Sequence, residues 1–289
     1  MEALLPTHPE SNTKLLKRSF DLYRASFSKV ILFAFLSALI IFIPRLIVNL
    51  FGTDIFFNVE PLSPLRLSLI LFNALALLFF IAILWNMHCV IKRIHEPLAD
   101  DLRVGLKKVF YVFVAAVIQN IIIFAVAAIL LGLYFLVHTG PLFTGRSLLG
   151  TLFISVVFIG QFILLAYVAT LFYFFVPLIA IENKTIFAAI EHSILLVWNH
   201  WWRTISLQAI PWISYLVTLI LIKMLTKVDL HLFFTNYLTL SFPAILLNIL
   251  VLTLFLPWAA SVLLVQLKDL ELRRIASGKL LRHEKRDSS

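Results

Sequence analysis

Six apolar segments, each long enough to cross a membrane as a helix, constrain this chain more than any other feature of its sequence. They are residues 30–50, 67–91, 109–137, 148–180, 204–225 and 238–267. About 20 apolar residues are needed to span the ~30 Å hydrocarbon core of a bilayer as a helix. A strand interpretation fails because the segments lack the alternating pattern of a barrel wall. The sequence therefore predicts an all-α, polytopic membrane protein with six transmembrane helices.

Composition excludes a water-soluble domain. Of the 289 residues, 62% are hydrophobic and 13% are charged, against roughly 45–50% and about 25% in an ordinary soluble domain. The segments 109–137, 148–180 and 238–267 exceed the minimum span, so we expect them to tilt, to kink or to continue beyond the hydrocarbon. Pro177 and Pro257 lie within two of them.

The basic residues are distributed unequally between the two sides of the predicted membrane. Nineteen of the 24 lysines and arginines fall in the terminal segments and in the connections on the same side as the termini, and five fall on the other side. The positive-inside rule then predicts that both termini are cytoplasmic, in a bacterial inner membrane. Because these charges flank membrane segments, we expect them to contact phospholipid and not nucleic acid.

Amphipathic stretches precede three of the predicted spans. Before the first span, apolar residues recur at helical spacing at Leu15, Leu16, Phe20, Tyr23 and Phe27, with basic residues largely between them. The pattern recurs at residues 184–203 before the fifth span, and a shorter version covers residues 99–110 before the third. Such stretches are typical of helices that lie in the headgroup region.

These stretches suggest an internal repeat of one interfacial helix followed by two spans. The units would be residues 14–98, 99–183 and 184–268, within one membrane domain that ends in a short basic cytoplasmic tail at 269–289. Common ancestry of the units is one explanation. The other is that amphipathic helices before hairpins resemble one another by physical constraint alone.

Four amide side chains are the best candidates for function within the predicted spans. Gln119, Asn120, Gln161 and Asn248 each lie about ten residues into a span, which at ~1.5 Å per residue places them near the membrane midplane. They either hold helices together by hydrogen bonds or line a cavity.

A second candidate group lies at the predicted cytoplasmic boundary and would contact lipid headgroups. Its members are Arg24, Lys29, Trp198, His200, Trp201, Trp202 and Arg203. A tryptophan belt with an interfacial arginine is also an ordinary feature of membrane proteins, so a specific ligand is not required to explain them.

The sequence lacks the common signatures of catalysis. It contains no P-loop, no His-Glu-x-x-His motif and no Gly-x-Ser-x-Gly elbow. The single cysteine, Cys89, cannot form a disulfide framework or a multi-cysteine metal site. We therefore expect no metal, no cofactor and no enzymatic activity.

Three segments carry a resemblance to a known family. They are KRSFDLYRASFSKVILF at 17–33, VIKRI at 90–94 followed by LRVGLKKVF at 102–110, and AAIEHSILLVWNHWWRTI at 188–205. With these patterns, nearly the whole chain resembles the YciC-like bacterial inner-membrane proteins. It is more distantly similar to the membrane domain of some glycerophosphodiester phosphodiesterases. The resemblance implies a six-span inner-membrane protein without an assigned reaction, and it supplies no catalytic residues.

Two functions follow as hypotheses. The first is a non-enzymatic protein that acts through helix packing and lipid contacts, in envelope or lipid homeostasis or as an accessory subunit. Its partners would be membrane phospholipids, other proteins or a second copy of the chain. The alternative is a small permease or lipid transporter whose path is lined by the four amides.

Overall fold

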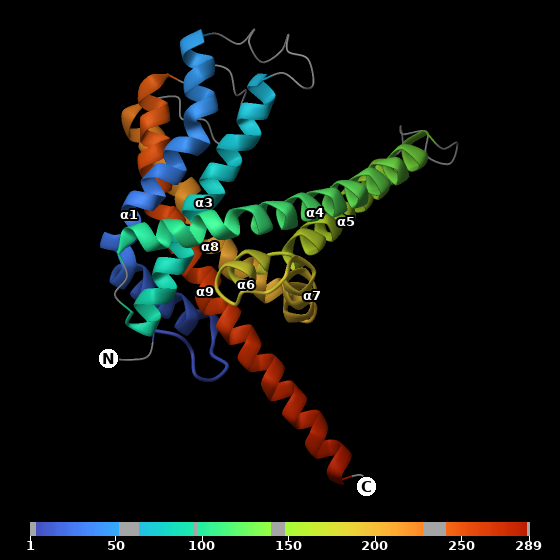
Figure 1. The fold of residues 1–289 in the computed structure, drawn as a ribbon. Coiled ribbons are helices and arrows are strands. Elements are labelled where there is room, and N and C mark those ends of the chain that lie inside the picture. Colours follow the sequence, from blue (N-terminus) through green and yellow to red (C-terminus); the bar gives the residue numbers. More distant parts are fainter. Residues whose placement is uncertain (1–3, 52–63, 95–96, 140–147, 228–240, 288–289) are drawn as a thin grey trace.

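The computed structural model describes residues 4–51, 64–94, 97–139, 148–227 and 241–287, and within them it contains helices and no strand (Figure 1). The helices are α1 (Asn12–Phe51), α3 (Pro64–Lys92), α4 (Leu98–Thr139), α5 (Leu148–Leu171), α6 (Phe175–Ala180), α7 (Ile186–Val197), α8 (Trp201–Thr226) and α9 (Phe242–Asp287). Six helical stretches of the described chain are long and apolar enough to cross a membrane. The predicted all-α, multi-pass architecture is confirmed.

The core is a bundle in which α1 packs against both α9 and α3, and α8 packs against α9 (Figure 1). Small residues allow the close contacts. Ala34 and Ala38 of α1 are completely buried, and the Ser37 hydroxyl between them donates to the Ala76 carbonyl of α3 at 3.2 Å. Helices in lipid associate through such close packing, because burial away from lipid brings no hydrophobic gain.

Helices α4 and α5 lie side by side and lead away from this bundle as an arm (Figure 1). Large apolar side chains are exposed on both helices, among them Phe124 at 75% and Phe162 at 68%. In a membrane protein these faces meet lipid chains, which solvate them as well as a protein core would.

The fourth predicted segment is not one straight helix, as α5 ends at Leu171 and α6 begins at Phe175. Pro177 lacks the N–H that would bond to a carbonyl one turn earlier, which favours a break just before it. The buried Ser193 of α7 satisfies the freed backbone groups: its hydroxyl donates to the Leu171 carbonyl at 2.7 Å and accepts from the Phe174 N–H at 3.1 Å. In contrast, α9 continues through Pro257 without a break.

The amphipathic stretches before the first and third spans are helical, but they are continuous with those spans in α1 and α4. Residues 12–43 contain neither proline nor glycine, so nothing in the sequence ends the helix between the two parts. Before the fifth span the stretch is a separate helix, α7, and α8 starts after a short turn.

The predicted repeat stays a prediction. Its three units share the order of elements, but only the third has a separate helix before its spans. Residues 52–63, 95–96, 140–147 and 228–240 of the predicted units and connections lie outside the described residues. The predicted basic tail continues α9 as helix to Asp287.

Candidate functional site

Charged side chains are buried together at one end of the bundle, which we call the polar end. The N-terminal segment (residues 4–11), the end of α3, the connection between α6 and α7, the start of α8 and the C-terminal half of α9 meet there. These segments are far apart in the sequence, so the site exists only in the folded chain.

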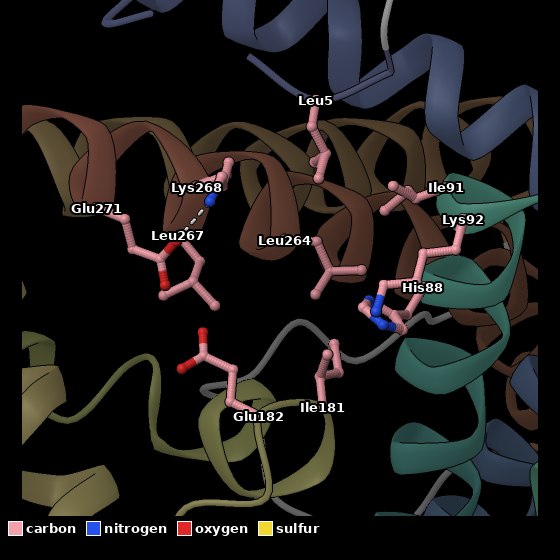
Figure 2. Close-up of a pocket in the computed structure, with 10 residues that line it drawn as sticks. All are labelled: Leu5, His88, Ile91, Lys92, Ile181, Glu182, Leu264, Leu267, Lys268 and Glu271. Atoms are coloured by element: carbon pink, nitrogen blue, oxygen red, sulfur yellow. Dashed lines mark hydrogen bonds and ion pairs between the residues drawn. The ribbon is translucent and has the colours of Figure 1, made fainter. Parts of the chain in front are cut away.

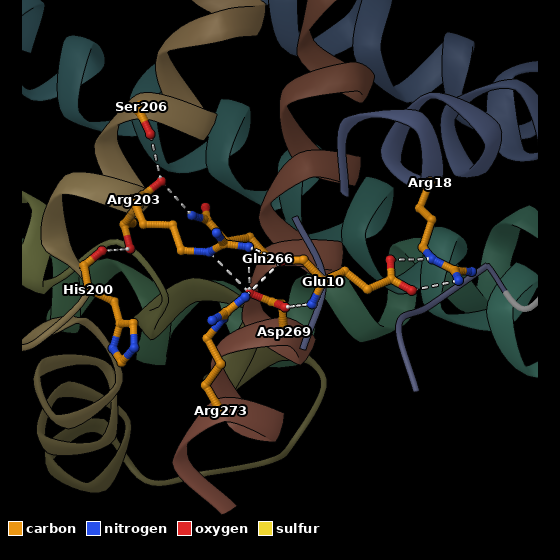
Figure 3. A network of polar contacts seen from close by, with 9 residues as sticks. Glu10, Arg18, His200, Arg203, Ser206, Gln266, Asp269 and Arg273 are labelled. Carbon is orange, nitrogen blue, oxygen red and sulfur yellow. Dashed lines mark hydrogen bonds and ion pairs between the residues drawn. The ribbon is translucent and has the colours of Figure 1, made fainter. Parts of the chain in front are cut away.

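Asp269 of α9 is the centre of the charge network at the polar end (Figure 3). Its side chain is fully buried. One carboxylate oxygen accepts from Arg203 at 3.1 Å and from Arg273 at 2.8 Å, and the other accepts from the Glu10 backbone N–H at 2.9 Å. Both arginines also donate to the Glu10 carbonyl. A carboxylate can be buried at tolerable cost only with such complete pairing.

The side chain of Glu10 extends the network to α1 (Figure 3). Its two oxygens accept from Arg18 at 2.7 Å each, in the bidentate geometry of strong guanidinium–carboxylate pairs. The hydrogen bond from Arg18 holds the pKa of the Glu10 carboxyl below its ordinary value, against the opposing effect of burial. Glu10 therefore fastens the N-terminal segment to α1, α8 and α9 while it is ionised.

Buried amides support Arg203 from inside the bundle. Gln208 of α8 donates to Gln266 of α9 at 2.9 Å, and Gln266 donates to the Arg203 carbonyl at 3.2 Å (Figure 3). A second buried polar contact joins α3 to α4, where Asn86 donates to Asp101 at 2.7 Å. These contacts fix the register between neighbouring helices.

A groove of about 930 Å³ opens between the N-terminal segment, α1 and the end of α3. Its lining includes the apolar Leu4, Leu5, Val90 and Ile91, beside Lys17, Arg18, Asp21 and Arg93. Arg93 has a positive φ of 58° just after α3, which is how the chain leaves the helix there. The groove thus combines an apolar wall with a basic edge.

A smaller pocket of about 240 Å³ lies on the other side of Leu5 and Ile91, which line both cavities. Figure 2 shows Glu182 and Glu271 facing each other at one side of it and His88 with Lys92 at the other. The residues that line it are Leu5, His88, Ile91, Lys92, Ile181, Glu182, Leu264, Leu267, Lys268 and Glu271.

The two glutamates of this pocket are hydrogen-bonded to each other. Glu182 also pairs with Lys184 at 2.9 Å, and Glu271 pairs with Lys268 at 3.0 Å. Burial raises the pKa of Glu182, but the hydrogen bond from Glu271 and the ammonium of Lys184 outweigh it, so the pKa is lowered overall. Two carboxyls can bond directly only by sharing a proton, so Glu271 is the protonated partner.

Histidines near the polar end are held in the neutral form. Burial first, and then the cations Arg273 and Arg203, lower the pKa of His200. Burial first, and then Lys184 and Arg274, lower the pKa of His192. Both imidazoles are therefore uncharged at neutral pH.

The four predicted amides belong to separate helix contacts. Asn248 of α9 is buried and bonds to the Tyr215 hydroxyl of α8 at 3.3 Å. Gln161 of α5 donates to the Leu130 carbonyl of α4 at 3.0 Å, whereas the exposed Asn120 donates to Ala116 of its own helix. Gln119 is half-buried on α4. The described structure therefore joins helices through Asn248 and Gln161, and it does not gather the four amides around one space.

The predicted lipid-contact residues divide into two groups. Trp198 and Trp202 are 57% and 69% exposed, and Arg24 is exposed while Lys29 and His200 are half-buried. Trp201 packs edge-on against Tyr167, with ring centroids 5.4 Å apart. The exception is Arg203, whose guanidinium contacts Asp269 and Glu10 rather than being free for a headgroup.

Sequence reasoning missed the acidic members of the polar end. Glu10, Glu182, Asp269 and Glu271 were assigned only to connecting segments and termini, although Asp269 and Glu10 are almost completely buried. The available signal was the spacing of Asp269 and Arg273, which lie four residues apart on one helical face. Among the described residues, no three histidine, cysteine or acidic side chains are grouped as a metal site would require.

No protein-family model, no curated protein and no solved structure matches this chain.

Proposed function

We propose that this chain is a multi-pass protein of the bacterial inner membrane, similar to the YciC-like proteins, that acts by binding anionic phospholipid at its cytoplasmic face. It performs no catalysis of its own and serves envelope or lipid homeostasis, or a larger assembly as an accessory subunit. Both termini are cytoplasmic, which puts the polar end beside the negatively charged inner leaflet.

The groove of the polar end is the observation that carries this proposal. Lys17 and Arg93 are exposed at its basic edge, and Leu4 and Val90 form part of its apolar wall. A phospholipid has the same two parts, a phosphate and an apolar chain, next to each other. Each basic residue near an anionic leaflet contributes ~1 kcal/mol of attraction, and the apolar wall contributes selectivity for a chain-bearing ligand over free phosphate.

The alternative, a permease with an amide-lined path, has less support. Asn248 and Gln161 already use donor groups in helix contacts, and Asn120 is bonded within its own helix. The two cavities described above lie at the polar end and not around these amides. A transport path would therefore require a second conformation in which these contacts are broken.

Lipid retention by the purified full-length chain tests the proposal. In native mass spectrometry from detergent, we expect phosphatidylglycerol to be retained in preference to phosphatidylcholine. The variant Lys17→Gln/Arg93→Gln should reduce its retention by about tenfold, which corresponds to ~1.4 kcal/mol.

The matched control is Arg103→Gln/Lys107→Gln, which removes the same charge from exposed positions on α4. If both double variants reduce retention equally, the effect reflects net charge and the groove is not a binding site. If neither variant changes retention and phosphatidylcholine binds as well, the proposed function is wrong.

A further inference from the structure

We propose that the 240 Å³ pocket between the α6–α7 connection and α9 binds a zwitterionic phosphoethanolamine group, whose ammonium replaces the proton shared by Glu182 and Glu271. This proposal does not depend on the groove or on anionic lipid. It concerns a different cavity and a ligand of different charge.

The charges of the pocket are separated, and this separation selects a zwitterion. Glu182 and Glu271 lie at one side, and His88 and Lys92 at the other (Figure 2). An ammonium group has favourable partners at the first side and a phosphate at the second. A purely anionic ligand would place part of its charge near carboxylates, and a purely cationic one would place it near Lys92.

The glutamate pair is a built cation site that a proton occupies when the pocket is empty. Lys184 and Lys268 each hold one carboxyl from outside, at 2.9 and 3.0 Å, and the carboxyls bond to each other across the pocket. A primary ammonium can donate to both carboxylates at once, as the shared proton does. Its entry releases that proton to solvent, so the net charge of the site is unchanged by binding.

The size and walls of the pocket fit a headgroup. A drug-sized ligand occupies about 300–1,000 Å³, whereas this pocket has about 240 Å³. Ile181, Leu264 and Leu267 form its apolar part, where polar groups of the ligand would gain no partner. The ligand thus consists of a compact polar group that reaches both charged sides, and any acyl chains remain outside.

Calorimetric titration of the detergent-solubilised full chain with glycerophosphoethanolamine tests the site directly. We expect binding of this compound to be at least about tenfold tighter than binding of glycerophosphocholine, because a quaternary ammonium has no N–H to donate to the carboxylates. Titrations in two buffers of different ionisation enthalpy should show release of up to about one proton per ligand bound.

The affinity should weaken as the pH is lowered, since protons then compete with the ammonium for the pair. The charged or titratable groups that face the pair or share the pocket are Lys184 and His192 on the α6–α7 side, Lys268 and Arg274 on α9, and His88 and Lys92 on α3. Of the groups on the glutamate side, the lysines and the arginine remain charged between pH 5 and 8, and burial disfavours protonation of His192.

Two variants separate proton exchange from simple loss of structure. Glu271→Gln keeps a hydrogen-bond donor for Glu182 but removes the exchangeable proton, so we expect measurable binding with little proton release. Glu182→Gln/Glu271→Gln should weaken binding by at least about tenfold. Glu191→Gln, on the exposed face of α7, is the charge-matched control and should change neither quantity.

The comparison with dioctanoyl phosphatidylethanolamine identifies the source of the group. Tighter binding of this lipid than of glycerophosphoethanolamine indicates a membrane lipid, and equal binding indicates a soluble phosphoethanolamine compound. Equal affinity for the choline and ethanolamine compounds, absence of proton release in the wild type, or no binding at all would overturn the proposal. These readouts are separate from phosphatidylglycerol retention in the Lys17→Gln/Arg93→Gln variant, so failure here and failure of the proposed function are distinguishable.

Discussion

Asp269 is the residue on which the polar end depends most. Its carboxylate accepts hydrogen bonds from two arginines on different helices and from the backbone of the N-terminal segment. Arg203 and Arg273 are only 20% and 26% exposed, so neither can turn fully into water if its partner is lost. The cost of removing the carboxylate is then dominated by cations left without compensation.

We expect Asp269→Asn to lower the free energy of unfolding by about 3 kcal/mol, the typical effect of breaking a buried pair by removing one partner. Thermal unfolding in detergent measures the change. Glu191→Gln removes one exposed carboxylate from α7 and should change stability by less than about 0.5 kcal/mol. Similar unfolding curves for both variants would show that the network around Asp269 contributes little.

Glu10 makes the attachment of the N-terminal segment dependent on pH. The hydrogen bond from Arg18 lowers the pKa of Glu10 below its ordinary value of 4.5. A group whose pKa is lowered by folding stabilises the fold fully above its unfolded pKa, and this contribution is lost as the pH falls through the folded pKa. The attachment should therefore be complete at neutral pH and should weaken below about pH 4.5.

Limited proteolysis near the N-terminus at graded pH, with an acid-active protease, measures this attachment. Cleavage of the wild type should increase as the pH falls below about 4.5. In Glu10→Gln the segment should be cleaved faster at pH 6 than in the wild type, with little further dependence on pH. A wild-type cleavage rate that is constant down to pH 3 would contradict the prediction.

At the scale of the elements, the contact between α3 and α4 depends on a glycine. A Cβ atom placed on Gly105 would lie 2.9 Å from the Leu78 carbonyl oxygen of α3, too close for any real contact. In contrast, a Cβ atom on Gly160 of α5 would meet nothing within 4 Å. The same substitution should therefore have opposite effects at these two positions.

We expect Gly105→Ala to destabilise the protein by about 1–3 kcal/mol, because the backbones of α3 and α4 must move apart. Gly160→Ala should be neutral or should stabilise by up to about 1 kcal/mol, since alanine is the better helix former. Thermal unfolding of the two variants in the same detergent provides the comparison. If Gly105→Ala is as stable as Gly160→Ala, the close approach of α3 and α4 is wrong.

The break between α5 and α6 shows how one element depends on another. Pro177 makes a continuous hydrogen-bond ladder impossible, but the side chain that satisfies the freed groups, Ser193, comes from α7. The turn is therefore stabilised by a tertiary contact. Because α6 and α7 flank the connection that carries Glu182, this contact also positions one wall of the small pocket.

At the scale of the whole molecule, both chain ends meet at the polar end, since the N-terminal segment is bonded to α9 through Asp269 and Arg273. An even number of spans places them on one side of the membrane. Lys14 on α1 and Lys227 at the end of α8 are both exposed, and they should lie on opposite sides. We propose that Lys14 is on the cytoplasmic side.

Cysteine labelling in intact cells checks this topology. The single native cysteine is buried, and Cys89→Ser provides the background. With a membrane-impermeant thiol reagent added outside the inner membrane, we expect Lys227→Cys to be labelled and Lys14→Cys to be labelled only after the membrane is opened. Labelling of both positions in intact spheroplasts would exclude the predicted arrangement.

Much of the architecture was predictable because lipid restricts the choices. Apolar length determines which segments cross a membrane, and the need for internal hydrogen bonding makes them helices. The separate helix α7 was also predictable from its amphipathic period. The break before α6 was predictable only as a kink near Pro177, because its location depends on Ser193.

The sequence by itself thus determined the class, the spans and the helical amphipathic segments of this protein, since these follow from local composition and period. Tertiary structure alone decided which polar groups meet. The four amides, equivalent in depth, were separated into different helix pairs, whereas Glu10 and Asp269, 259 residues apart, were joined. Local hydropathy measures the cost of placing a group in lipid, but the partner that offsets this cost can come from any part of the chain.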